Sequence, residues 1–248
     1  FIYGNDQQQI QPRQRAINAN KQLQDYHFRI AHEATKQQLN KQGLSPAKVG
    51  ININRNLKKS DHIIFSDNME SGTGSWTSVA YSNTDIWHQT TINSSSPASS
   101  WWAGIDQRGN YNSGTRVNCA LISPAINLTA KIAPIKLLFT ENYVTESGWD
   151  FCMVDVSKDG GSTWESLRGA YGTAPSGDSY GWTVSTLDLS AYAGQTIQVR
   201  FYLDTFDALY NDFPGWFVDD VLIFDAGGLI TGKKFFDINN NSIKNIGE

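Results

Sequence analysis

The clearest pattern in the chain is the alternation of apolar and polar residues over short runs. In residues 196–204 (TIQVRFYLD) every second residue is apolar, namely Ile197, Val199, Phe201 and Leu203. Residues 134–143 (PIKLLFTENY) alternate in the same way. Because successive side chains of a strand point to opposite faces, each run predicts a half-buried antiparallel strand. About ten such segments, separated by turn-forming residues, fill residues 61–228 and predict an all-β sandwich of two antiparallel sheets, a jelly roll.

Residues 1–60 follow a different pattern. From Gln7 to Gly43 the chain is rich in Gln, Lys, Arg, Ala and Asn, and its apolar residues recur at spacings near three, four and seven. This periodicity predicts a long amphipathic α-helix that ends at Gly43, with Pro46 preventing its continuation. We expect the residues after the helix to form a linker or an extended arm. Since the helix alone buries little apolar surface, we expect it to pack on the β domain or on a partner chain.

Composition narrows the class of protein. With 248 residues, 18% charged residues, 12% aromatic residues, 8 Trp and 21 Gly, the chain suits packed strands joined by tight turns. The formal net charge of -4 offers no basic surface for phosphates, which argues against nucleic acid as a partner. No run approaches the roughly eighteen apolar residues of a transmembrane helix, so we expect no membrane span. The first residues of the chain do not have the pattern of a signal peptide. In an extracellular protein, processing would already have removed that segment.

The segment SKDGGSTW, residues 157–164, can be interpreted as a turn or as a catalytic loop. Apolar runs of strand length flank it, and Asp followed by Gly is a strong signal for a hairpin turn, because Gly adopts positive φ without a steric penalty. We therefore expect a turn in which Asp159 and Thr163 bond nearby backbone amides. The segment resembles the Asp-box, a turn motif in which the Asp lies away from the chemistry.

No catalytic motif is complete in the sequence. The segment HEATK, residues 32–36, has Lys36 where a zinc-protease motif needs its second His, so a helix could not present two zinc ligands there. No nucleophile triad, phosphate loop or nucleotide-binding motif is present either, and we expect no catalytic residues. Cys119 and Cys152 lie in strand-like runs without the spacing of a metal or redox site. A disulfide between neighbouring strands and two buried thiols both remain open.

Two acidic clusters raise the question of a metal. The run GWFVDDVLIFD is apolar on both faces, yet Asp219 and Asp220 lie in its middle, so at least one carboxylate faces an apolar layer. It needs a basic partner, backbone amides or a hard cation with oxygen ligands. The run FSDNMESG adds Asp67 and Glu70 at the start of the β region. Glu141 continues the inward face of its own strand and also needs a partner.

Ordered sequence blocks place this region near a known family. The blocks FSDNMESGTGSW, SWWAG, ALISPAINL, FTENYVTESGWDFCMVDVSKDGGSTWESL and GWFVDDVLIF resemble the jelly-roll, MAM-like domains that follow secreted peptidases of the immune inhibitor A type. They are also similar to the cleaved adhesin modules of gingipain-like proteases. The resemblance implies a Ca²⁺ ion that fastens the first strand to the last. It makes Glu70 and Asp220 the first ligand candidates, followed by Asp67 and Asp219.

The carboxyl-terminal residues 229–248 carry a second calcium signal. Oxygen side chains in DINNNSIKNIGE occupy loop positions 1, 3, 5, 9 and 12 of the calcium-binding EF-hand pattern, namely Asp237, Asn239, Asn241, Asn245 and Glu248. Ser242 stands at position 6, where the pattern has Gly. The segment resembles the opening of the calcium-binding B-type repeats of bacterial surface adhesins. Its low ligand charge predicts weak affinity.

Trp101 and Trp102 are the sequence candidates for ligand binding. In a regular strand one indole would face the core and the other would face outward as a platform for sugars or partners, whereas a bent segment would bury both. We therefore expect a non-catalytic, calcium-stabilised extracellular module for adhesion or assembly at a bacterial cell surface, with a protein or glycan partner. The alternatives are a carbohydrate-binding module and an accessory domain of a secreted peptidase. Exposed, coplanar aromatic residues favour the carbohydrate alternative, and a flat polar face favours assembly.

Overall fold

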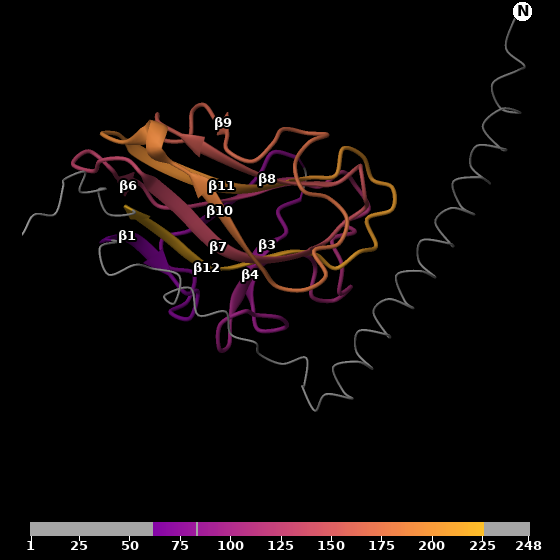
Figure 1. Cartoon of the computed structure of the whole chain (residues 1–248). Coiled ribbons are helices and arrows are strands. Elements are labelled where there is room, and N and C mark those ends of the chain that lie inside the picture. Colours follow the sequence, from indigo (N-terminus) through magenta and orange to yellow (C-terminus); the bar gives the residue numbers. More distant parts are fainter. Residues whose placement is uncertain (1–61, 83, 226–248) are drawn as a thin grey trace, which may run out of the picture. The chain divides into compact units, whose positions relative to one another are not determined.

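The computed structural model describes residues 62–82 and 84–225, which form two antiparallel β-sheets packed face to face (Figure 1). The predicted all-β sandwich is confirmed for these residues. Their only helical element is a short 3₁₀ turn, Ser190–Tyr192. The predicted amphipathic helix and linker of residues 1–60 and the predicted calcium loop of residues 229–248 lie outside the described residues. Within the described part of the chain, no helix is long and apolar enough to cross a membrane.

The first sheet has the order β10-β7-β12-β4-β3, and β1 pairs with a second part of β12. Its strands are β1 (His62–Asp67), β3 (Trp87–Thr90), β4 (Ser100–Ala103), β7 (Ile135–Val144), β10 (Thr183–Asp188) and β12 (Gly215–Asp225). The second sheet has the order β2-β5-β11-β8-β9, and β6 also pairs with β11. Its strands are β2 (Thr77–Ala80), β5 (Asn118–Ile122), β6 (Ile126–Asn127), β8 (Phe151–Ser157), β9 (Glu165–Ser166) and β11 (Thr196–Asp204).

The core lies between the sheets and is built from alternate residues of the long strands. The four alternating apolar residues of β11 are each at most 1% exposed, as their period predicts: Ile197, Val199, Phe201 and Leu203. Phe201 packs edge-on against Phe139 of the opposite sheet, with ring centroids 5.0 Å apart. It also contacts Trp216 of β12 at 5.7 Å. These aromatic contacts join the two sheets from which the loops extend.

A buried ion pair crosses the same core. Glu141 of β7 is 2% exposed, and Arg168, which follows β9, donates to both of its carboxylate oxygens. The indole Nε1 of Trp216 donates to Glu141 Oε2 at 2.9 Å. The Arg168 guanidinium lies 5.3 Å from the ring centroid of Phe139, so it also has an aromatic partner. The prediction that Glu141 is compensated is therefore confirmed, and its partner is Arg168.

The two cysteines are free and buried. Cys119 of β5 and Cys152 of β8 both lie opposite Leu203 of β11, one on each side. Two strand spacings separate them, roughly 9–10 Å, whereas a disulfide needs Cα atoms within about 7 Å. Burial raises the pKa of the Cys119 thiol to about 12. The sequence left open a disulfide or two buried thiols, and the structure has two buried thiols.

The segment after β8 is a turn, as predicted. The backbone N–H of Thr163 donates to Asp159 Oδ1 at 2.9 Å, and the Thr163 hydroxyl donates to Oδ2 at 2.6 Å. Gly160 and Gly161 have φ values of 70° and 88°, which favour glycine. The hydrogen bonds from Thr163 lower the pKa of Asp159 to about 2. Asp159 thus closes a surface turn.

Candidate functional site

The two acidic residues of β12 lie at a break in strand pairing. Residues 216–218 of β12 pair with β4, and residues 221–225 pair with β1 on the same edge. Asp219 and Asp220 fall between these segments, and the register with β7 shifts between Asp219 and Leu222. Asp220 has a φ of 51°, a left-handed conformation that is uncommon outside glycine. A bulge of this kind turns adjacent side chains out of the strand's regular alternation.

Asp219 is fully buried and bound by backbone amides. Its Oδ2 accepts hydrogen bonds from the N–H groups of Ser95 and Ser96, both at 2.9 Å, and its Oδ1 accepts from the N–H of Asp220 at 2.7 Å. Burial raises its pKa to about 6, and the amide hydrogen bonds oppose that shift. Of the three forms of compensation predicted for these acids, the described structure shows backbone amides for Asp219.

Glu70 approaches the same loop from the β1–β2 connection. Its Oε1 accepts from the N–H groups of Ala98 and Ser99 at 3.1 and 2.9 Å. The hydroxyl of Ser96 lies 3.2 Å from Glu70 Oε1 and 3.3 Å from Asp219 Oδ1, so this serine joins the two carboxylates. Two of the predicted ligand candidates, far apart in sequence, therefore meet at the β3–β4 loop.

Asp67 is directed into its own turn. Its Oδ1 accepts from the N–H of Met69 at 2.8 Å, and its Oδ2 accepts from the indole Nε1 of Trp76 at 2.9 Å. Both oxygens therefore have local partners that shape the end of β1. This geometry gives Asp67 a structural role in its own turn, and no hydrogen bond joins it to Glu70, Asp219 or Asp220 in the described structure.

Asp220 is the least compensated of the four acids. Its Oδ2 is buried and has no hydrogen-bond partner in the described structure. Burial raises its pKa to about 7, and the charges of Asp219 and Glu70 add to the shift. Among residues 62–82 and 84–225, no group of three or more His, Cys, Asp or Glu side chains has metal-binding geometry. One carboxylate oxygen of Asp220 is therefore unsatisfied in the described structure. It lies where the neighbour of β12 changes from β4 to β1, a place that we call the β1–β4 junction.

The two tryptophans proposed as a binding platform are both buried. Trp101 is 3% exposed and belongs to the core between the sheets. Trp102 is 1% exposed, stacks on Phe217 with centroids 5.2 Å apart, and donates its indole N–H to the carbonyl of Pro214 at 2.7 Å. Covered by these contacts, neither indole can stack with a ligand. The prediction of an exposed platform at these residues is therefore wrong. Trp101 fills the core, whereas Trp102 is buried by contacts with Phe217 and Pro214 in a regularly paired strand and not in a bent segment.

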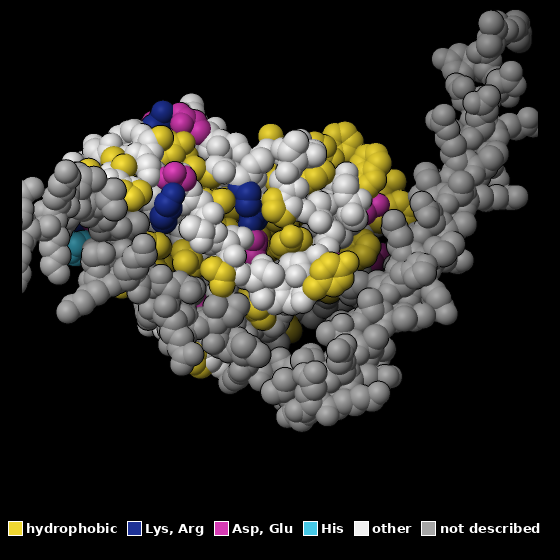
Figure 2. Space-filling model, viewed as in Figure 1, with side chains coloured by type: hydrophobic (Ala, Val, Ile, Leu, Met, Phe, Trp, Pro, Cys, Tyr) yellow, Lys and Arg dark blue, Asp and Glu magenta, His cyan; other side chains and the backbone are white. Residues whose placement is uncertain are grey.

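Aromatic side chains are instead exposed on the loops at one end of the sandwich. Three of them, together with Leu209, form what we call the end patch, and the exposed fractions are 54%, 41%, 53% and 55% for Trp149, Tyr171, Phe206 and Leu209, respectively. They come from the β7–β8, β9–β10 and β11–β12 loops. Figure 2 shows apolar side chains gathered at this end, where the gold β11–β12 loop of Figure 1 lies. Sequence reasoning missed the end patch, because loop aromatics carry no periodic signal.

Three residues of the end patch are joined through Tyr171. Tyr171 lies 5.3 Å from Phe206 and 4.7 Å from the buried Phe151, measured between ring centroids. The Tyr171 hydroxyl donates to the carbonyl of Trp149 at 3.1 Å. The Arg116 guanidinium lies 5.9 Å from the Phe206 ring and pairs with Asp204 at 2.7 Å. The patch therefore combines an apolar floor with a charged rim.

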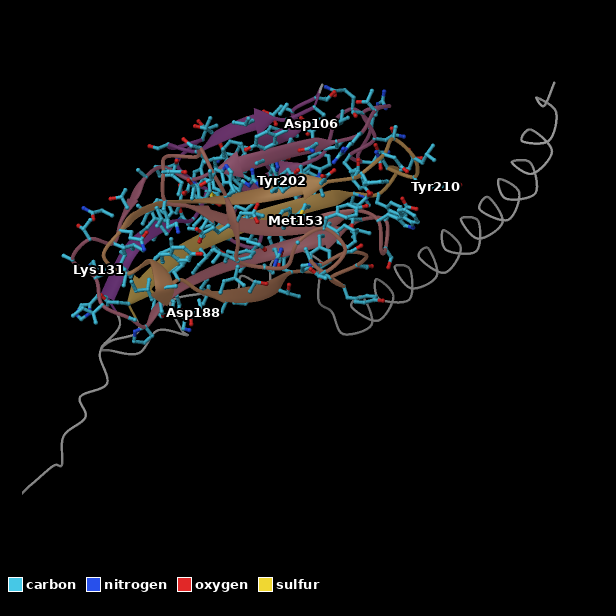
Figure 3. The ribbon with its side chains drawn as sticks, turned by 90° about the horizontal axis from the view of Figure 1, so that it is seen from above. Asp106, Lys131, Met153, Asp188, Tyr202 and Tyr210 are labelled. Carbon is cyan, nitrogen blue, oxygen red and sulfur yellow. The ribbon has the colours of Figure 1, made fainter. Side chains whose placement is uncertain are left out.

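The outer face of the second sheet continues from this rim. Arg200 lies 4.3 Å from the ring of Tyr202, 4.6 Å from that of Trp164 and 5.3 Å from that of Tyr81. Its guanidinium also binds Asp155, with Nε 2.8 Å from Oδ2. Figure 3 shows Tyr202 on this face, between the loop end marked by Tyr210 and the opposite end marked by Lys131. Arg200 covers the faces of these rings, so the aromatic side chains of the end patch are more accessible to a ligand than those on the outer face of the second sheet.

Comparison with known proteins gives partial similarities. No family model matches the chain. Bacillopeptidase F from Bacillus subtilis is 29% identical over 171 residues, which cover 68% of this chain and 11% of that protein. The CBM22-1 xylan-binding domain from Paenibacillus barcinonensis has 12% identity and a TM-score of 0.42, and covers 69% of this chain and 99% of that chain. A cleaved adhesin domain of Lys-gingipain from Porphyromonas gingivalis has 18% identity and a TM-score of 0.39, and covers 66% and 98%, respectively.

Proposed function

We propose that this chain is a non-catalytic binding module that works outside the cell and holds a carbohydrate chain against its end patch. The observation that carries the proposal is the exposure of four large apolar side chains, between 41% and 55%, on three loops of the sandwich. Contiguous exposed apolar surface on a soluble domain marks an interaction site. The module is non-catalytic in this proposal because its sequence lacks a complete catalytic motif.

A glycan suits the chemistry of the end patch. A pyranose ring has an apolar C–H face and a rim of hydroxyl groups, so it pairs with an aromatic ring below and with polar groups at the side. Tyr171 and Phe206 supply the rings, and Arg116 with Asp204 supplies charged groups next to them. The surface is aromatic and not a flat polar face, which favours carbohydrate binding over assembly.

Calcium is proposed as a structural ion at the β1–β4 junction. Ca²⁺ takes six to eight oxygen ligands, including carboxylates, carbonyls and water. The unpartnered Oδ2 of Asp220 supports this proposal, and Glu70 and Asp219 lie around the same loop. The ion would neutralise Asp220 and connect the last strand to the β1–β2 and β3–β4 loops. Calcium in the loop of Asp237, Asn239, Asn241, Asn245 and Glu248 remains a prediction outside the described residues.

A second candidate function is that of an accessory domain of a secreted peptidase. The similarity to Bacillopeptidase F favours it, although the match spans 11% of that protein. In this case the end patch would hold a polypeptide, because an apolar floor with a charged rim also suits an extended peptide. Attachment at a bacterial cell surface, through a glycan or a protein, is compatible with either candidate.

Binding assays with paired variants test the proposal. Phe206→Ala and Tyr171→Ala should each weaken binding to a soluble polysaccharide at least about fivefold, because each removes a stacking ring whose truncation costs roughly 1 kcal/mol or more. Isothermal titration calorimetry against xylan, mixed-linkage glucan and cellulose oligosaccharides provides the measurement, with denatured casein as the polypeptide probe. Ile132→Ala is the matched control, since Ile132 is 81% exposed and follows Lys131 at the opposite end of the sandwich (Figure 3).

The outcomes separate the candidates. Loss of glycan binding in the end-patch variants, with binding retained in Ile132→Ala, would support the carbohydrate proposal. Binding of casein alone, lost in the same variants, would favour the peptidase accessory role. Equal affinity of all three variants for a bound glycan would refute the assignment of the end patch.

A further inference from the structure

A buried polar group lies beneath the end patch. Tyr111, Asp150 and Asn211 are each 0% exposed and come from the β4–β5, β7–β8 and β11–β12 loops. The Tyr111 hydroxyl donates to Asp150 Oδ2 and accepts from the N–H of Glu146 at 3.0 Å. Asp150 directly follows Trp149 of the end patch, and Asn211 lies two residues after Leu209. Two members of the group therefore lie next to end-patch residues along the chain.

Asp150 and Asn211 converge on Thr205. In the pairing of β8 with β11, Cys152 lies opposite Leu203 and Phe151 lies opposite Asp204, so Asp150 comes next to Thr205. The side-chain N–H of Asn211 donates to the Thr205 hydroxyl oxygen at 3.4 Å. Thr205 is also bonded to the residue before β5, because its hydroxyl oxygen accepts a hydrogen bond from the N–H of Val117 at 2.9 Å. The register of β8 and β11, continued by one residue, therefore places Asp150 beside Thr205, the residue to which Asn211 donates.

Each of these two side chains has one oxygen without a partner. Asp150 Oδ1 and Asn211 Oδ1 are buried and accept no hydrogen bond in the described structure. An ionised carboxylate and an amide oxygen are both acceptors only, so they cannot satisfy each other. A proton on Asp150 Oδ1 would turn it into a donor to Asn211 Oδ1 and satisfy both atoms with one hydrogen bond.

The charges around Asp150 favour a proton. Burial raises the pKa of Asp150 to about 8, and the nearby carboxylates of Glu146 and Asp207 oppose its ionisation further. Hydrogen bonds from Tyr111 and from the backbone of Glu146 lower the pKa of Asp150, but they do not outweigh burial. The pKa of Tyr111 itself is raised well above 10, mainly by burial, so its hydroxyl stays protonated and donates.

We propose that Asp150 is protonated in the folded protein at neutral pH and donates to Asn211, and that this hydrogen bond holds the β11–β12 loop where it presents Phe206 and Leu209. Loss of the proton leaves a carboxylate facing an amide oxygen, so the loop detaches from the sandwich and the end patch is disrupted. Binding at the end patch then decreases at alkaline pH. This last consequence rests on the proposed function, whereas the protonation of Asp150 does not.

The proton also links folding to pH. The folded protein binds this proton more tightly than the unfolded chain, in which an Asp has a pKa of about 3.9. The contribution of Asp150 to stability is therefore full below pH 4, falls as the pH rises toward the folded pKa of about 8, and is constant above it. A conventional surface Asp has no such dependence in this range.

Asp150→Asn tests the proposal, because its amide keeps the shape of the carboxyl and supplies a donor at every pH. Relative to this variant, the unfolding equilibrium constant of the wild-type chain should rise by up to about tenfold per pH unit between pH 5 and 8, then level off. Urea unfolding from pH 5 to 9.5 gives the constants. Asp106→Asn, in an exposed loop carboxyl, is the control and should follow the wild type.

Two further measurements keep the outcomes separate. The carboxyl carbon of Asp150 in the wild-type chain, followed by NMR, should titrate near pH 8; titration near pH 4, or a parallel pH dependence of wild type and Asp150→Asn, would overturn the proposal. Glycan affinity should fall above pH 8 in the wild type and not in Asp150→Asn. If no glycan binds at any pH but the NMR titration lies near 8, the proposed function fails and the protonated Asp150 stands.

Discussion

At the scale of single residues, the interior of this sandwich is specified by polar groups as well as by apolar ones. Glu141 sits between the sheets with Arg168 as its ion-pair partner and Trp216 as a further donor. The alternation along β7 predicts that Glu141 points inward and needs a partner. The identity of that partner could not be predicted, because Arg168 lies in an irregular segment after a two-residue strand. Only the folded chain brings it into the core.

The Glu141–Arg168 pair yields a prediction on stability. Arg168→Met should destabilise the fold by about 3–5 kcal/mol, because it leaves the carboxylate of Glu141 buried without its counter-ion. Lys136→Met is the control; Lys136 pairs with the exposed Asp188 at 3.2 Å, and losing such a surface pair has little effect. Urea denaturation at pH 7 provides both values. Equal losses in the two variants would show that the buried pair contributes no more than a surface pair.

At the scale of elements, β12 is the strand whose interruption creates a site. It pairs along one edge with β4 and then with β1, and the bulge at Asp219 and Asp220 falls where one neighbour gives way to the other. The sequence predicts an acidic interruption in a buried strand, and the resemblance to calcium-binding modules connects it with Glu70. The sharing of Ser96 between Glu70 and Asp219 could not be predicted, since it depends on the path of the β3–β4 loop.

Calcium dependence is the prediction at this scale. If Ca²⁺ binds at the β1–β4 junction of the native state only, excess Ca²⁺ should raise the melting temperature by several degrees relative to EDTA. Differential scanning calorimetry measures the shift. Asp220→Asn removes the uncompensated charge, so it should reduce the response to Ca²⁺ while raising the stability in EDTA, where the buried charge is otherwise unsatisfied.

Controls separate the two possible calcium sites. Glu248→Gln alters the predicted carboxyl-terminal loop and leaves the junction unchanged. A response to Ca²⁺ that disappears in Glu248→Gln but persists in Asp220→Asn would assign the ion to the loop and not to the junction. A melting temperature that is the same in Ca²⁺ and in EDTA for the wild type would contradict both sites.

At the scale of the whole molecule, residues 62–82 and 84–225 share one core that spans both sheets. Cys119 and Cys152 lie inside it on either side of Leu203 and are fully buried. Because neither thiol is near solvent, a reagent can reach them only when the sandwich opens. The two thiols therefore report on whether the domain unfolds as a unit.

Thiol labelling supplies the corresponding prediction. In increasing urea, both cysteines should react with a maleimide at the same midpoint as the change in tryptophan fluorescence, since one cooperative transition exposes them. Mass spectrometry of the labelled peptides identifies each site, and the fully unfolded chain serves as the control for complete reaction. Labelling of either cysteine well below the fluorescence midpoint would show that one sheet opens before the other. A reducing agent should leave the midpoint unchanged, because the folded chain contains no disulfide between these residues.

The sequence by itself determined the class of the fold, the strands with alternating residues, the turn at Asp159 and the need to compensate Glu141, Asp219 and Asp220. These properties follow from local periodicity and from the free-energy cost of burying charge, which neighbouring residues alone reveal. The tertiary structure decided the burial of both Trp101 and Trp102, the choice of Arg168 as a partner and the gathering of the end patch. Each of these depends on how loops distant in sequence pack together, and that arrangement leaves no repeat in the sequence.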